Sequence, residues 1–124
     1  VEKNEEAVAL LGKNRVAFAV AHLKIVHGKA PEALENLPAP THVFIGGSSG
    51  NLKEILDIVR KKNKAVRVVI NAITLETVTE ALTYLKEQEI SGAEVVSVQT
   101  ARAREVGRYH MMTGQNPVYV ISFG

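Results

Sequence analysis

The chain has 124 residues, of which 46% are hydrophobic and 23% charged, and its formal net charge is +2. This length suits one modest domain, residues 1–124, with a single core, and the small charge argues against a nucleic-acid partner. Because the sequence contains no cysteine, disulfides, thiol catalysis and zinc–thiolate sites are excluded. No apolar run approaches the roughly 18 residues of a membrane span, and no signal-peptide pattern opens the chain. We therefore expect a cytoplasmic protein with no membrane partner.

The first forty residues predict a helix, a strand and a turn. Asn4 can cap a helix because its side-chain oxygen can accept a bond from a free first-turn N–H, and the helix should end by about Ala19. The stretch from His22 to Gly28 reads as a short strand. A connection marked by prolines, with a short helical stretch, leads to the next element.

The middle of the chain alternates buried strands with helices. Residues 42–46, "HVFIG", are apolar and rich in β-branched and aromatic side chains, which is typical of a buried strand. Asn51 is expected to cap the helix that follows and ends near Lys62. Residues 65–74 predict another strand, and either Thr74 or Thr77 starts the next helix. This alternation indicates βαβ units and a parallel sheet.

Two final strands are expected over residues 93–99 and 116–123, separated by a long loop from Thr100 to Gln115. A parallel pair needs a crossover connection, and no helix lies between these strands, so we expect them to be antiparallel. The fold class is therefore α/β, with an antiparallel pair at the end of the chain.

Ligands of open α/β sheets bind at the carboxyl ends of the parallel strands. That rule selects the segments 28–31, 46–51, 71–75 and 100–115. We expect all four to lie at one edge of the sheet, which we call the ligand edge.

The glycines between Gly46 and Gly50 have the spacing G-G-x-x-G, which matches neither a dinucleotide fingerprint nor a Walker loop. Anion binding by backbone N–H groups, close approach of a ligand to the backbone, and a simple turn all remain open. Glu2 is either a ligand for ribose hydroxyls or a solvated carboxylate at a helix start.

Three further groups are candidates for chemistry. Arg102, Arg104 and Arg108 form either a clamp for a polyanionic substrate or a solvated basic loop. Asn71 is polar at the end of a buried strand, which makes it a site candidate. The histidines at 22, 27 and 42 share no metal-ligand spacing, and we expect no metal site.

Four segments together resemble one family: "GKAPEAL", "PTHVFIGGSSGNLKEIL", "VVINAITLETVTEAL" and "VVSVQTARAREVGRYHMMTGQNPVYVISFG". They look like the methyltransferase/decarboxylase part of the decarboxylating precorrin-6Y C(5,15)-methyltransferases of cobalamin biosynthesis. The resemblance implies a Rossmann-like class I fold that uses S-adenosylmethionine, with strand order 3-2-1-4-5-7-6 and strand 7 antiparallel. It also implies a corrin precursor, a tetrapyrrole with acetate and propionate groups, as substrate. The family removes carbon dioxide from a ring acetate and favours homo-oligomers, usually tetramers.

The resemblance also assigns roles to residues. Glu2 corresponds to the acidic ribose ligand, while Gly28, Lys29 and Ala30 correspond to the loop that flanks the adenine. Lys29 departs from the family, whose members usually carry an acidic residue there. The positions beside the methionine portion and the transferring methyl group are Ile45, Gly46 and Gly47. Arg102 and Arg104 correspond to a basic motif near the substrate, and we expect them, with Asn71, to orient it.

The family's first strand and its glycine-rich loop have no counterpart after Val1, so we interpret the chain as a C-terminal portion of such a domain. We expect this portion to bind S-adenosylmethionine poorly and to be inactive, although the intact protein is an enzyme. Without its central strand, the sheet should close either by pairing His22–His27 beside Val43–Ile45 or by accepting a second copy. Two alternatives stay open: another Rossmann-fold methyltransferase with a small-molecule or RNA substrate, and an inactive assembly module.

Overall fold

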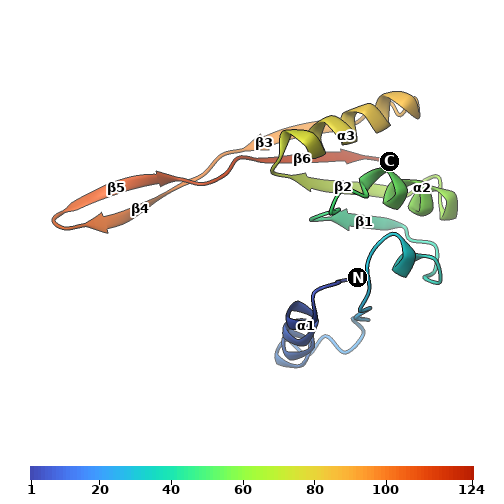
Figure 1. Cartoon of the computed structure of the whole chain (residues 1–124), viewed down its shortest axis with the longest axis horizontal. Coiled ribbons are helices and arrows are strands. Elements are labelled where there is room, and N and C mark those ends of the chain that lie inside the picture. Colours follow the sequence, from blue (N-terminus) through green and yellow to red (C-terminus); the bar gives the residue numbers. More distant parts are fainter.

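The computed structural model describes all 124 residues and has an α/β architecture, as predicted. A four-stranded sheet carries two helices on one face, and a two-stranded ribbon projects from it (Figure 1). The elements in chain order are α1 (Glu5–Ala17), the 3₁₀ turn η1 (Glu32–Leu34), β1 (His42–Ile45), α2 (Leu52–Lys62), β2 (Arg67–Ala72), α3 (Leu75–Glu87), β3 (Glu94–Val98), β4 (Ala101–Val106), β5 (Tyr109–Gly114) and β6 (Val118–Phe123).

The sheet has the strand order β1-β2-β6-β3. β1 and β2 are parallel, whereas β6 runs antiparallel to both of its neighbours. The predicted antiparallel pair at the end of the chain is therefore confirmed. The order also matches the 4-5-7-6 part of the sheet that the resemblance implies.

The hydrophobic core lies between this sheet and the helices α2 and α3. The strand β2 alternates, so that Val68 and Ile70 are buried on the helix side while Val69 faces the other way. In α2 the buried residues recur at helical spacing and are Leu52, Ile55, Leu56 and Val59. Thr74 begins α3, and its hydroxyl oxygen accepts a hydrogen bond from the backbone N–H of Thr77 at 3.2 Å. The regular spacing of the buried side chains and the N-terminal cap of α3 therefore define this half of the fold.

The N-terminal part differs from the prediction. Asn4 caps α1 by accepting from the backbone N–H of Ala7 at 2.9 Å, as expected, but the helix ends at Ala17 and buries no residue. The strand predicted from His22 to Gly28 is wrong, because only His27 forms a bridge, parallel to Glu2. A strand persists only beside a neighbouring strand, and the short segment at Glu2 supplies a single residue.

The prediction that His22–His27 pairs beside β1 is also wrong. β1 is an edge strand of the sheet and pairs only with β2. Figure 1 shows the N-terminal segment and α1 lying apart from β1, and the space between them forms the cavity described below. The alternative in which a second copy fills this slot stays a prediction.

The long loop predicted over residues 100–115 is wrong as well, because this segment forms an antiparallel hairpin. β4 and β5 pair over six residues each, and the connection is a two-residue turn in which Gly107 has φ +59°. This is the turn geometry in which glycine at the first central position is preferred. We call β4 and β5 together the arm.

The arm continues β3 and β6 across an irregularity in their pairing. Val98 pairs with Val118, and the backbone N–H of Gln115 donates to the carbonyl of Thr100 at 2.9 Å. One residue, Gln99, therefore faces two residues on the other strand, Asn116 and Pro117. Such a bulge interrupts the ladder, and proline donates no hydrogen bond to it, so the arm forms a sheet of its own that projects beyond the main sheet (Figure 1).

Candidate functional site

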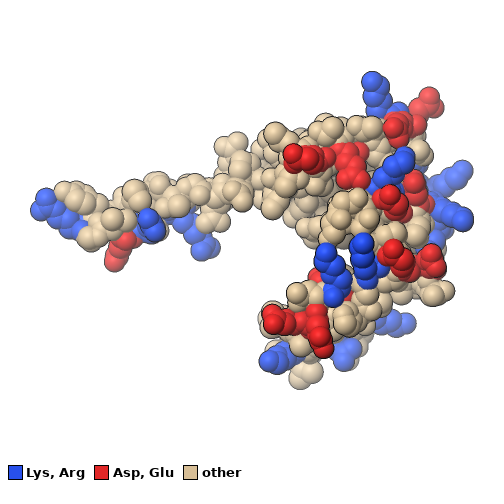
Figure 2. All heavy atoms as spheres, in the orientation of Figure 1, with Lys and Arg blue, Asp and Glu red and all other residues tan.

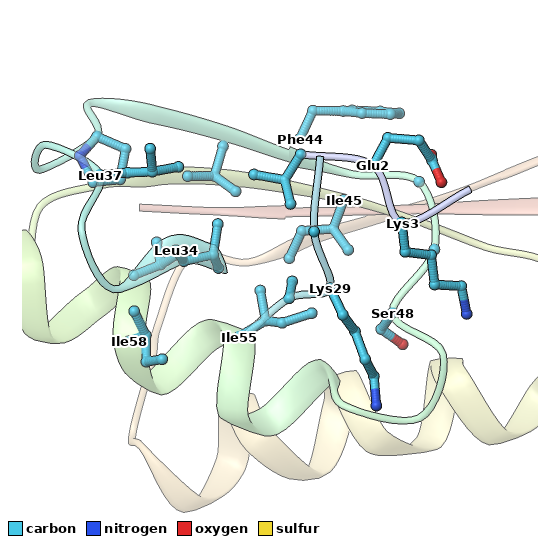
Figure 3. Close-up of a pocket in the computed structure, with 18 of the residues that line it drawn as sticks. Glu2, Lys3, Lys29, Leu34, Leu37, Phe44, Ile45, Ser48, Ile55 and Ile58 are labelled. Carbon is cyan, nitrogen blue, oxygen red and sulfur yellow. The ribbon is translucent and has the colours of Figure 1, made fainter. Parts of the chain in front are cut away.

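A cavity of about 820 Å³ lies between the N-terminal segment and β1, within the range of about 300–1,000 Å³ typical of ligand pockets. Figure 3 shows two unlike ends. Leu34, Leu37 and Ile58 make one end apolar, whereas the other end carries the charged side chains of Glu2 and Lys3. A ligand that fits this cavity has an apolar portion and a polar portion.

The structure brings seven of the ten sequence-predicted site residues together in this cavity. They come from three segments that are distant in the sequence: the start of the chain, the turn before η1, and the end of β1. The seven are Glu2, Gly28, Lys29, Ala30, Ile45, Gly46 and Gly47.

Glu2 is held in place through its backbone and its side chain. Its backbone N–H donates to the carbonyl of Val26, and its carbonyl accepts from Gly28, each at 3.0 Å. Its carboxylate oxygen Oε1 accepts from the backbone N–H of Asn4 at 2.8 Å. A half-buried carboxylate fixed in this way accepts hydrogen bonds from hydroxyl groups, which is the chemistry that a ribose requires.

The glycines in and near the site play different structural roles. A Cβ at Gly28 would stand 2.9 Å from the Cβ of Ala33, so this glycine allows the turn before η1 to pack closely. At Gly46 a Cβ would meet only the Phe44 ring, at 3.3 Å, and at Gly47 nothing lies within 4 Å. Gly50 has φ +81°, which suits a turn. The backbone at Gly46 and Gly47 is therefore open to a ligand.

The loop after Gly47 contains one correction and one residue that the sequence analysis missed. Asn51 precedes α2 but makes no side-chain cap, because its amide Nδ2 donates to the Ser48 carbonyl at 3.4 Å. Lys3 donates from Nζ to the hydroxyl of Ser49 at 2.8 Å, which joins the two sides of the cavity. The only sequence signal for Lys3 is that it follows Glu2. Lys29 also lines the cavity (Figure 3).

Three predicted site residues lie outside this cavity. Asn71 is half-buried near the end of β2, opposite Val120, on the sheet face away from α2 and α3. Arg102 and Arg104 are exposed on the arm. At its tip, Arg108 donates to the Tyr109 hydroxyl from Nε at 3.2 Å and from Nη2 at 3.0 Å. The structure thus separates the expected cofactor residues from the expected substrate residues.

The groups with shifted pKa values lie between α2 and α3, away from the cavity. Burial raises the pKa of Tyr84, and so does the hydrogen bond of its hydroxyl to Asp57 at 3.0 Å. The hydrogen bond and ion pair with Glu87, at 3.1 Å, raise the pKa of Lys53. These shifts belong to helix packing rather than to the site.

Two further features are absent from the structure. No three histidine, aspartate or glutamate side chains are grouped so that they could hold a metal ion. None of the helices combines the length and the apolar character needed to cross a membrane.

Comparison with known proteins gives a consistent picture. The family model described as the precorrin methyltransferase domain matches residues 1–123. A probable cobalt-precorrin-6B C(15)-methyltransferase (decarboxylating) from Pyrobaculum calidifontis is 36% identical over 123 residues, covering 98% of this chain and 63% of the relative.

Similarity to solved structures indicates the same family. The crystal structure of precorrin-6Y C5,15-methyltransferase from Geobacter metallireducens superposes with a TM-score of 0.85 at 35% identity, covering 98% of this chain and 65% of that one. A SAM-dependent O-methyltransferase from Thermotoga maritima shares the fold alone, with a TM-score of 0.67 at 14% identity over 98% of this chain and 47% of that one. The chain spans less than two thirds of the length of each of these three proteins. The fold is the Rossmann-like fold of methyltransferases, and the chain belongs to the precorrin methyltransferase domain family.

Proposed function

We propose that the full-length protein methylates a precorrin, using S-adenosylmethionine, and couples this step to decarboxylation of a ring acetate in cobalamin biosynthesis. The observation that carries the proposal is the cavity in which Glu2, the Gly28–Ala30 turn and the Gly46–Gly47 backbone meet. Family membership and the names of the relatives support the choice of reaction.

The residues present fit S-adenosylmethionine. The Glu2 carboxylate would accept from the ribose hydroxyls, Ala30 would contact the adenine, and Ile45 would lie beside the methionine portion. The open backbone at Gly46 and Gly47 would leave room for the methionine portion. When bound, the cofactor supplies an activated methyl group, so the protein's task is to orient the reactants and exclude water. Lys29 offers donors only, so this chain has no acceptor at the position where the family resemblance implies an acidic residue.

The substrate would be held by residues outside the cavity. Guanidinium groups suit carboxylates because they present a planar fork of donors, and Arg102 and Arg104 are exposed on one face of the arm. We assign them, with Asn71, to orienting the carboxylates of a tetrapyrrole. In the decarboxylation step the conjugated ring takes up the electron pair that the departing carbon dioxide leaves behind, so the protein residues hold the substrate and shield it from water.

The test uses the full-length protein with methyl-labelled S-adenosylmethionine and a cobalt-precorrin. We expect label in the tetrapyrrole together with release of carbon dioxide, and we expect Arg102→Ala to raise KM or lower kcat. Transfer of label to RNA or to an unrelated small molecule, with none to the tetrapyrrole, would replace this proposal with a different methyltransferase activity. Unchanged KM and kcat in Arg102→Ala would remove the role assigned to Arg102.

A cytoplasmic homo-oligomer, a tetramer by family habit, without nucleic-acid or membrane partners, is part of the same proposal. The small net charge and the uncovered arm are consistent with it. We also propose that the 124-residue chain by itself is inactive and binds S-adenosylmethionine weakly, because its cavity is open along the unpaired edge of β1. Micromolar binding in isothermal titration of this chain would overturn that statement.

A further inference from the structure

The apolar end of the cavity is held by several contacts between its two sides. Lys62, in the last turn of α2, donates from Nζ to the backbone carbonyls of Glu35 and Leu37, each at 2.7 Å. Leu34 packs against the hydrophobic core. Hydrogen bonds from a charged donor are among the stronger ones, so we expect this end to stay closed.

The polar end of the cavity is held by a single hydrogen bond. The ammonium group of Lys3 donates to the Ser49 hydroxyl at 2.8 Å, and the Lys3 side chain extends from the N-terminal segment toward the loop after β1 (Figure 3). It is the only hydrogen bond between residues 1–29 and residues 41–124. No ion pair joins these two parts, although Figure 2 shows basic groups where the part with α1 faces the rest of the molecule. The polar end can thus open by breaking one bond, with the apolar end as the hinge.

Lys3 and Glu2 belong to one hydrogen-bonded unit. The Lys3 carbonyl can only accept, so His27 donates to it from Nε2, at 3.2 Å. Glu2 forms a parallel bridge with His27, and its carbonyl accepts from the backbone N–H of Gly28 at 3.0 Å. The Lys3 ammonium group therefore moves together with the Glu2 carboxylate and the turn that begins at Gly28.

Ser49 has a backbone conformation that serine rarely adopts. Its φ is +52°, in the left-handed region, and Gly50 follows with φ +81°. A residue with a Cβ is strained there, and such strain is concentrated at sites of binding and switching. Both Lys3 and Ser49 are exposed, and neither side chain makes another hydrogen bond. Because water competes for such a bond, it contributes little to folding and can open in each binding cycle.

We propose that Lys3 is a latch: its bond to Ser49 forms over a ligand in the cavity, delays release of that ligand and keeps Glu2 in place beside it. Lys3 is thus a positioning residue that acts through Ser49. An ammonium group has three donors, so Lys3 can keep this bond while it donates to an acceptor on the ligand. The identity of the ligand, S-adenosylmethionine or its product, rests on the proposed function, whereas the closing of the cavity does not.

The release rate of S-adenosylhomocysteine from the full-length protein, measured by surface plasmon resonance, tests the latch. We expect Lys3→Met to raise the dissociation rate constant about fivefold, as suits the loss of one exposed hydrogen bond from a charged donor. Lys3→Arg should restore most of the slow release, because its guanidinium group also donates. Lys13→Met removes the same charge from an exposed position of α1 and should leave the rate unchanged. An unchanged rate in Lys3→Met, or an equal rise in Lys13→Met, would overturn the proposal.

A double-mutant cycle shows whether Lys3 acts through Ser49. Ser49→Ala removes the acceptor and should raise the release rate as much as Lys3→Met does. The variant that carries both substitutions should then release the ligand no faster than either single variant, because both remove the same bond. Effects that multiply in the double variant would show that Lys3 acts on the ligand without Ser49, which contradicts a latch.

Hydrogen exchange of the full-length protein without ligand separates the latch from the proposed function. The backbone N–H of Asn51 donates to the Ser48 carbonyl at 3.1 Å, within the loop that Lys3 holds. We expect this N–H to exchange severalfold faster in Lys3→Met than in the wild type or in Lys13→Met. A wild type that does not bind S-adenosylhomocysteine would count against the proposed function, and exchange would still decide the latch, since equal exchange in all three proteins would overturn it.

Discussion

The molecule has two kinds of region, which differ in the interactions that stabilise them. The α2–β2–α3 half, with the ends of β1 and β6, contains all 15 buried residues, the first of which is Ile45. The N-terminal segment with α1, and the arm, contain none. Both of these regions keep their shape by local hydrogen bonds and strand pairing.

The difference matters because the candidate site is divided between the two kinds of region. Ile45 belongs to the packed half, and Gly46 and Gly47 come directly after it in the chain. Glu2 and the Gly28–Ala30 turn belong to the unpacked N-terminal segment. The packed half can therefore fold whether or not Glu2 and the Gly28–Ala30 turn are in place. The site itself depends on regions that need further contacts to become rigid.

The largest expected effect is on stability in the packed half. Leu56 is 0% exposed, and Leu56→Ala should lower the free energy of unfolding by about 2–5 kcal/mol because it removes buried methyl groups and leaves a cavity. Urea unfolding followed by circular dichroism measures this change. Leu10→Ala in α1, where Leu10 is 56% exposed, is the matched control and should change it by about 0.5 kcal/mol or less. Equal losses would show that α1 belongs to the cooperative core.

Helix caps give a second, smaller comparison. Thr74 and Asn4 each accept a bond from a first-turn backbone N–H, and loss of such a cap costs about 1 kcal/mol. Thr74→Ala should lower the unfolding midpoint because α3 packs on the core. Asn4→Ala should reduce helical signal and leave that midpoint unchanged, because α1 buries nothing. A midpoint shift in Asn4→Ala as large as in Thr74→Ala would contradict the division into two kinds of region.

The smallest expected effect is on the pH dependence of stability. Because burial and the bond to Asp57 raise the pKa of Tyr84, the unfolded chain loses its proton first as pH rises above about 10. The stabilisation is therefore complete below the unfolded pKa and is lost as pH rises through the folded pKa. Urea midpoints measured from pH 8 to 11 should fall less steeply in Tyr84→Phe than in the wild type. Tyr109→Phe, on the arm, should keep the wild-type slope. If its slope is as shallow as that of Tyr84→Phe, the raised pKa of Tyr84 does not explain the pH dependence.

The packed half was the predictable part of the fold. Leu52, Ile55 and Val59 recur at helical spacing, and the apolar runs of β1 and β2 indicate buried strands. These patterns reflect burial within the chain itself, so local sequence contains them. The gathering of Glu2, Gly28 and Gly46 came from the family resemblance, because no local pattern relates such distant positions.

The two failures have a common physical cause. Residues 22–28 have strand-like composition, but pairing depends on a neighbour, and only Glu2 is available. The sequence predicts a loop for the arm because no apolar alternation marks its strands, and the structure shows why: every residue of β4 and β5 is exposed. The Gly107–Arg108 pair, flanked by equal lengths of chain, was the signal for a two-residue hairpin turn.

Binding of S-adenosylhomocysteine to the full-length protein tests most directly whether the cavity is the cofactor site. Isothermal titration should show at least about tenfold weaker binding for Glu2→Gln than for the wild type, equivalent to about 1.4 kcal/mol, because the charged acceptor for the ribose hydroxyls is lost. An analogue without the 2′ and 3′ hydroxyls should bind both proteins equally. Equal affinity of the two proteins for S-adenosylhomocysteine itself would contradict the assignment of the cavity.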